Sequence, residues 1–217
     1  MRHAYGQSSL PLGEDWPPFQ GGTRRHPSKL FFCLKPTPFA ARGMNRDAAR
    51  HAGSRTPRAA YPADLLHMTL LCMEQFDEPP RHLIPSIDAA IRRIRARPIR
   101  IDLDGSDLFG GKRHLVLTSS AVNRELRSFV RMLWNTLTRH NLPRFPLASF
   151  EPHVTVIYDC GKIDPLPVER PFGWIAEEFQ LIYSHFGESR HEEFGRWRFD
   201  PEAPPYLSPP EQLRFPI

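Results

Sequence analysis

The chain has 217 residues, of which 40% are hydrophobic, and a formal net charge of +5. This length and apolar content suit one domain with a sizeable core and exclude a wholly disordered chain. No run approaches the 18 apolar residues of a membrane span, and the first residues lack the apolar stretch of a secretory leader, so we expect a cytoplasmic monomer without membrane contact.

The cysteines, the prolines and the net charge further narrow the class of protein. Cys33, Cys72 and Cys160 are widely spaced and form no CxxC or Cys/His zinc pattern, which indicates buried free thiols. Many of the 24 prolines lie at the two ends, so we expect an irregular arm over 1–27 and a Pro-rich tail over 201–217 around a domain at 28–200. The positive charge favours a polyanionic partner, although a basic soluble surface explains it equally well.

The first half of the chain alternates strands and helices. Hydrophobic periodicity and the positions of Pro and Gly predict a central strand at 29–34, a helix at 38–53, a loop at 55–64, a long strand at 66–76 and a second helix at 81–96. Four arginines load the end of that second helix, and a solvated face explains them better than a nucleic-acid contact.

The second half continues the pattern. It predicts a strand at 99–103, a Gly-containing turn at 104–113, a strand at 114–118, the clearest helix at 123–140, a loop at 142–152, a strand at 153–159 and a final hairpin at 178–183 and 192–199.

One tetrapeptide pattern occurs twice within these strands. His67-Met68-Thr69-Leu70 and His153-Val154-Thr155-Val156 both place His, apolar, Thr, apolar in that order. Because side chains alternate along a strand, His67 and Thr69 share one face, and so do His153 and Thr155. If the strands are neighbours, two imidazoles and two hydroxyls converge on one place.

An internal repeat supports this convergence. A strand, a helix, a loop and then His67 are echoed by a strand, a helix, a loop and then His153, over similar distances along the chain. Repeats of this kind predict two similar lobes related by a pseudo-twofold axis, which would bring both motif strands to a shared cleft.

Two histidines suit acid–base chemistry on a phosphate. Imidazole titrates near neutral pH, so one can deprotonate a water while the other protonates the leaving oxygen. Thr69 and Thr155 could donate hydrogen bonds to the non-bridging phosphate oxygens. This scheme requires no metal and no cofactor.

Other interpretations remain open. The two histidines could be structural, satisfied by backbone partners, or they could bind a metal, although the chain offers no HxH or HExxH spacing. His191, beside two glutamates, looks polar and exposed. His114 begins a strand and could line the cleft, yet a structural role explains both better.

The two motifs resemble those of the two-histidine phosphoesterase superfamily, in particular the RNA 2′,3′-cyclic phosphodiesterases also called 2′-5′ RNA ligases. The similarity covers about 29–199: the strand 29–34 resembles the family's opening strand, 66–70 its first motif, 150–156 its second, with Pro152 directly before the histidine, and the hairpin its last element.

The resemblance implies an α+β fold of two lobes, with antiparallel sheets and outer helices flanking a central cleft. It implies opening of a 2′,3′-cyclic phosphate, on an RNA end or a small nucleotide, to a 2′-phosphate, with 2′-5′ ligation as the reverse reaction. If the family's residue roles apply at the matching positions, His153 would be the base that deprotonates water and His67 the acid. Tyr158, Phe32 and His114 are further candidates for substrate contact.

The chain departs from the family around these motifs. Leu65 or Leu66 stands where relatives often have Asn, and Tyr158 stands where RNA-type relatives often have a cation. These departures leave the histidine chemistry intact and bear on the substrate. They motivate the alternative that the protein is a nucleotide- or RNA-binding module without turnover.

Overall fold

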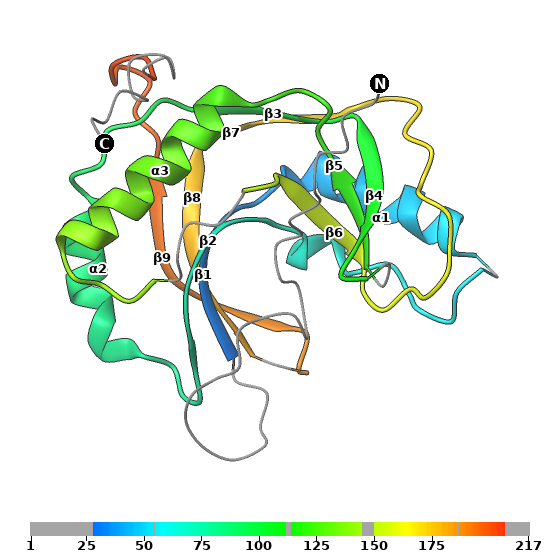
Figure 1. The fold of residues 1–217 in the computed structure, drawn as a ribbon, viewed down its shortest axis with the longest axis horizontal. Coiled ribbons are helices and arrows are strands. Elements are labelled where there is room, and N and C mark those ends of the chain that lie inside the picture. Colours follow the sequence, from blue (N-terminus) through cyan, green and yellow to red (C-terminus); the bar gives the residue numbers. More distant parts are fainter. Residues whose placement is uncertain (1–27, 54, 112–113, 145–149, 186, 207–217) are drawn as a thin grey trace, which may run out of the picture.

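The computed structural model describes residues 28–53, 55–111, 114–144, 150–185 and 187–206. The proposed arm at 1–27 and most of the proposed tail, from 207 onward, lie outside the described residues. The fold is α+β, with a four-stranded sheet in the order β2-β1-β8-β9, a three-stranded sheet in the order β4-β5-β6 and a two-stranded pair β3-β7 (Figure 1). Every strand pairing among them is antiparallel.

The elements have the following bounds. The helices are α1 (Pro38–Ala52), α2 (Ile84–Ile91) and α3 (Arg124–Arg139), with short 3-10 turns at Ala63–Leu65 and Arg81–Leu83. The strands are β1 (Ser28–Leu34), β2 (Met68–Phe76), β3 (Ile99–Leu103), β4 (Gly105–Phe109), β5 (His114–Thr118), β6 (His153–Ile157), β7 (Phe172–Ala176), β8 (Glu178–His185) and β9 (Arg190–Arg198).

The four-stranded sheet has two different faces because side chains alternate along β1. Leu30, Phe32 and Leu34 belong to the main hydrophobic core. Phe31 and Cys33 lie on the other face, in a small separate apolar cluster with Ile182 and Cys72. One face of this sheet is therefore covered by core, while the other carries the first motif.

The sequence repeat is present as two strand–helix–strand units, β1-α1-β2 and β5-α3-β6. In each unit the two strands are antiparallel neighbours, with Cys33 opposite Thr69 in one and Val116 opposite Thr155 in the other. The two threonines thus have matching places in their sheets, as a pseudo-twofold arrangement requires.

The helix of each unit packs against the sheet that contains the other unit. Helix α1 contacts β6 and β7, whereas α3 contacts β2 of the four-stranded sheet. In Figure 1, α3 and α2 accordingly lie beside β8 and β9, and α1 lies behind β4, β5 and β6. Phe129 of α3 packs against Phe179 and Phe199, both at ring-centroid distances of 4.9 Å. The two lobes are interlocked by this exchange.

Local chemistry explains where the long helices begin. The hydroxyl of Thr37 accepts a hydrogen bond from the amide of Ala40, and the Asn123 side chain accepts one from Leu126, which are the usual N-terminal caps. Pro38 occupies the first turn of α1, where its missing N–H costs nothing. The expected helices at 38–53 and 123–140 are confirmed to within a residue or two.

Two expectations about elements were wrong, and one strand was missed. The second helix is shorter than 81–96: Pro85 lies in the first turn of α2, and the chain leaves the helix after Ile91 in a turn that bonds Ile94 to Ile91. The predicted turn at 104–113 contains β4, with the turn itself at Gly110 and Gly111, both at positive φ. Strand β7, paired with β3, was not expected at all.

The described end of the chain docks onto the segment after α2. Arg97 donates a hydrogen bond to the carbonyl of Ala203, which is fully buried, and the Tyr206 hydroxyl donates to the carbonyl of Arg97. Among the described helices, none is long and apolar enough to span a bilayer.

Candidate active site

His67 lies directly before β2 and is held by its own backbone. Its Nδ1 is 2.8 Å from the carbonyl oxygen of Leu65. A carbonyl only accepts hydrogen bonds, so Nδ1 carries the proton and Nε2 keeps its lone pair when the ring is uncharged. The ring of Phe31 stacks on the imidazole at 4.9 Å. The first histidine therefore has a fixed tautomer and one covered face.

His153, the first residue of β6, has the same arrangement. Its Nδ1 is 2.7 Å from the carbonyl oxygen of Glu151, again two residues earlier in the chain. The ring of Phe109 from β4 lies 5.0 Å from the imidazole. Each histidine thus presents Nε2 as its reactive nitrogen beside one phenylalanine.

The surroundings of the two imidazoles differ in charge. Burial, followed by the like charge of His191, lowers the pKa of His67 to about 3, and Lys35 and His153 act in the same direction. Burial also lowers the pKa of His153, but there the Glu151 carboxylate opposes the shift. Protonation is therefore disfavoured at both rings.

The structure brings the two motifs together. His153 is one of the groups whose charge acts on His67, and strands β2 and β6 contact each other. The amide of Tyr61, just upstream of the first motif, donates a 2.7 Å hydrogen bond to the carbonyl of Val156 in the second. The two motif strands are therefore neighbours in the fold, as the repeat predicts.

The threonines and their neighbours complete the site. Thr155 is buried and Thr69 half-buried, and Thr155 shares a side-chain hydrogen bond with Tyr158. The Tyr158 ring packs edge-on against Tyr61 and His114. Tyr158 and His114 therefore lie close to the second motif. The buried His114 also accepts a hydrogen bond from the Asp159 amide, so its Nδ1 is engaged by the backbone.

Phe32 does not lie at the site. Its side chain is fully buried in the main core, where it packs against Phe179 and Trp197. The phenylalanine of this strand that contacts the first motif is its neighbour Phe31, whose ring stacks on His67. The strand 29–34 is apolar on both faces, so the sequence offered no alternation to choose between the two phenylalanines.

His191 is the residue that sequence reasoning missed. Expected to be exposed, it lies in β9 with its ring edge-on to His67 at 5.1 Å and to Phe31 at 6.0 Å. Its Nδ1 is buried and has no hydrogen-bond partner among the described residues. Burial and the charges of Lys35 and His185 lower its pKa to about 4. Local periodicity carried no signal for its position, because both Glu192 and Glu193 beside it are polar.

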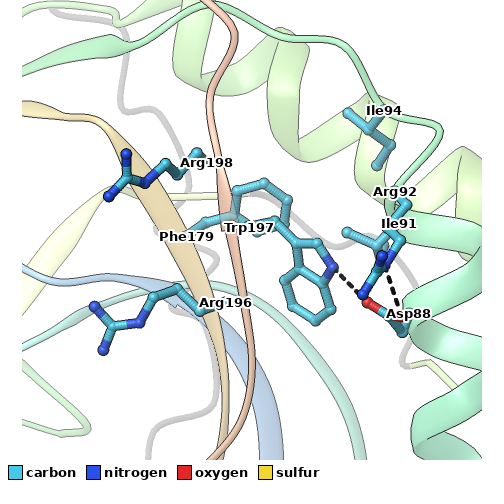
Figure 2. Close-up of a pocket in the computed structure, with 8 residues that line it drawn as sticks. All are labelled: Asp88, Ile91, Arg92, Ile94, Phe179, Arg196, Trp197 and Arg198. Carbon is cyan, nitrogen blue, oxygen red and sulfur yellow. Dashed lines mark hydrogen bonds and ion pairs between the residues drawn. The ribbon is translucent and has the colours of Figure 1, made fainter.

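A separate pocket lies away from the histidines, between β9 and α2. Figure 2 shows the Trp197 indole turned toward α2, while Arg196 and Arg198 point to the opposite side of the strand. The indole N–H and Arg92 both bind the carboxylate of Asp88. The polar groups facing this pocket thus satisfy one another, and no motif residue lines it.

Metal ligands are not grouped in the described part of the chain: no three His, Cys, Asp or Glu side chains there could hold one ion. The three cysteines are free, with Cys33 and Cys160 buried and Cys72 half-buried. Burial raises the pKa of the Cys33 thiol to about 12, so that thiol stays protonated at neutral pH.

Comparison with known proteins agrees with this geometry. The 2′-5′ RNA ligase superfamily matches residues 38–182. Solved structures match in fold: Escherichia coli LigT complexed with 3′-AMP has a TM-score of 0.68 at 22% identity, covering 80% of this chain and 98% of that one. The protein TT0787 of Thermus thermophilus has a TM-score of 0.66 at 20% identity, covering 80% and 99%. No curated protein sequence matches.

Two interlocked antiparallel lobes with a His-x-Thr motif in each define a two-histidine phosphoesterase fold. The chain belongs to the 2′-5′ RNA ligase superfamily.

Proposed function

We propose that the protein is a metal-independent phosphodiesterase that opens 2′,3′-cyclic phosphates on RNA ends or small nucleotides to 2′-phosphates. The carrying observation is the matched tethering of His67 and His153: each Nδ1–H is bound to the carbonyl two residues earlier. That arrangement leaves two Nε2 atoms, one from each lobe, as a base and an acid.

The proposed reaction is an in-line displacement on phosphorus. One Nε2 removes a proton from water as the water oxygen bonds to phosphorus. The bond from phosphorus to the 3′ oxygen breaks, and that oxygen takes the proton from the other imidazole's Nε2. The hydroxyls of Thr69 and Thr155 donate hydrogen bonds to the non-bridging oxygens, where charge is spread during transfer. If the 5′-hydroxyl of a second RNA end takes the place of the water, the same steps bond its oxygen to phosphorus and break the bond to the 3′ oxygen, and the product is a 2′-5′ phosphodiester.

The substrate class rests on two supports. E. coli LigT has been crystallised with 3′-AMP, ATP and NADP+, and this chain shares its fold. The chain also carries a net charge of +5, which favours an anionic ligand. We further propose that the protein acts in the cytoplasm as a monomer, the latter measurable by light scattering.

The test is hydrolysis of a panel of 2′,3′-cyclic nucleotides and short oligonucleotides ending in a cyclic phosphate, in excess chelator. We expect a 2′-phosphate product and a bell-shaped pH–rate profile. His67→Ala and His153→Ala should each lose about 10²–10⁴-fold in kcat, the usual size of one acid–base contribution. The proposal fails if wild type is inert on the whole panel or if both variants keep full activity.

A second candidate function is binding without turnover. Tyr158 stands where RNA-type relatives often place a cation, and its ring is enclosed by Tyr61 and His114. A binding module would retain nucleotides in calorimetry, with His67→Ala as the weakened control, and would convert no member of the panel.

A further inference from the structure

Each motif histidine is preceded by a backbone carbonyl that a long cationic side chain holds. Lys35, which follows β1, donates a 2.6 Å hydrogen bond from Nζ to the carbonyl of Asp64. Arg127, in the first turns of α3, donates a 2.6 Å bond from Nη1 to the carbonyl of Phe150. Asp64 and Phe150 both lie three residues before their histidine, so the two contacts are equivalent.

These carbonyls are adjacent to the ones that tether the imidazoles. In both lobes the carbonyl three residues back accepts from the cation and the carbonyl two residues back accepts from Nδ1–H. A peptide is planar, so fixing one carbonyl fixes the plane of its peptide and limits the direction of the next carbonyl. The cation thereby restricts the acceptor that sets the imidazole's tautomer and angle.

The two cations come from unrelated elements, which argues against simple duplication of a surface contact. Lys35 follows strand β1, whereas Arg127 belongs to helix α3. Both side chains are half-buried, and charge–charge interactions add to the contacts: Asp64 acts on Lys35, and the Glu151 carboxylate lies 3.6 Å from Arg127. In the described residues no hydrogen bond joins either cation to an imidazole. The charge of Lys35 acts on His67 directly, whereas the orientation of each ring is affected through the backbone.

We propose that Lys35 and Arg127 are positioning residues, one for each lobe, that hold the segment before the motif so that His67 and His153 keep the Nδ1–H tautomer and a productive angle. The activity part of this inference rests on the proposed function. The tautomer part does not.

The test uses Lys35→Met and Arg127→Met, which keep the length of the side chain and remove its donors. Lys162→Met and Arg124→Met, both at exposed positions, are the matched controls. Imidazole ¹⁵N shifts in NMR report the tautomer. We expect only the Nδ1–H form at His67 and His153 in wild type and the controls. A mixture should appear at His67 in Lys35→Met and at His153 in Arg127→Met.

Turnover of a cyclic phosphate supplies the second measurement. Loss of orientation should lower kcat by about 10–100-fold, as displacements near 1 Å do, with KM changed less than about twofold, because the substrate contacts remain. Lys35→Arg and Arg127→Lys, which restore a donor, should recover most of kcat. A general loss of structure would instead affect both histidines and would not be repaired by the donor.

The inference is overturned if each Met variant keeps one tautomer at its histidine, or if the mixture appears equally in the controls. If a Met variant loses its folded near-ultraviolet circular dichroism, Lys35→Gln or Arg127→Gln replaces it under the same criteria. If wild type turns over no cyclic phosphate, the proposed function fails, while the NMR result still decides the role of the two cations.

Discussion

At the scale of residues, the two histidines make the same hydrogen bond through Nδ1 but have different charged groups around them. Lys35 and His191 disfavour a proton on His67. At His153 the neighbouring His114 also disfavours one, but the Glu151 carboxylate favours it. A phosphate bound between the rings would act on both alike, so the protein charges decide the difference. Since Lys35 is a cation and Glu151 an anion, we expect His67 to act as the base and His153 as the acid, the reverse of the roles that the family resemblance implies.

An aryl phosphodiester tests this direction. Its p-nitrophenolate leaves without a proton, so loss of the acid should matter little and loss of the base should matter fully. We expect His153→Ala to recover about 10²-fold or more relative to its defect on the cyclic phosphate, in line with one acid contribution. His67→Ala should not recover. The opposite pattern would restore the roles carried over from the family.

The two His-x-Thr motifs could be found in the sequence because a repeated pattern of polar residues in apolar strands needs no knowledge of packing. Phe31, Phe109 and His191 could not. Their place at the site depends on which strands pair and in what register, and His191 reaches His67 only because β9 joins the sheet through β8. Such long-range pairing is invisible to local periodicity.

At the scale of elements, α3 is predictable as a helix but its partner is not. Its apolar stripe requires some sheet to cover it, and the stripe alone does not say that the sheet belongs to the other unit. Strands β4 and β7 were not predicted for a related reason. β4 is short and nowhere fully buried. In β7, exposed Gly173 and Ile175 alternate with buried Trp174. β4 therefore lacks the apolar run that marks a central strand, and the run in β7 is only five residues long and contains a glycine.

Phe129 should be the main anchor of α3. It is fully buried between two other phenylalanines, so Phe129→Ala should lower the free energy of unfolding by about 3–5 kcal/mol. Denaturant titration measures the loss. The matched control is Phe39→Ala in α1, where the side chain is 84% exposed, with an expected change within about 0.5 kcal/mol. Equal effects at both positions would contradict the packing described for α3.

At the scale of the whole molecule, the site imposes a pH dependence on folding. Burial lowers the pKa of His67 to about 3 and of His191 to about 4, from 6.5. Below pH 6.5 the unfolded chain therefore binds protons that the folded chain does not, and stability falls as the pH drops from 6.5 toward 4. Above pH 7 these two groups contribute no slope.

The free energy of unfolding, measured by chemical denaturation between pH 8 and 4.5, checks this predicted loss of stability. The double variant His67→Phe/His191→Phe should have a flatter dependence of unfolding free energy on pH than wild type, because two depressed groups are removed. His82→Phe, at an exposed position, should keep the wild-type slope. An unchanged slope in the double variant would show that the two imidazoles are not the groups that resist protonation.

The exchange of helices between lobes has a consequence for how the chain is made on the ribosome. When the first unit has emerged, α1 lacks β6 and β7, and β1 lacks β8, its neighbour in the finished sheet. Those partners are translated more than 100 residues after β1 begins. Pairing across such separations makes folding slow and leaves apolar strands uncovered. The first histidine is thus synthesised early, yet it acquires its surroundings only when the final hairpin arrives.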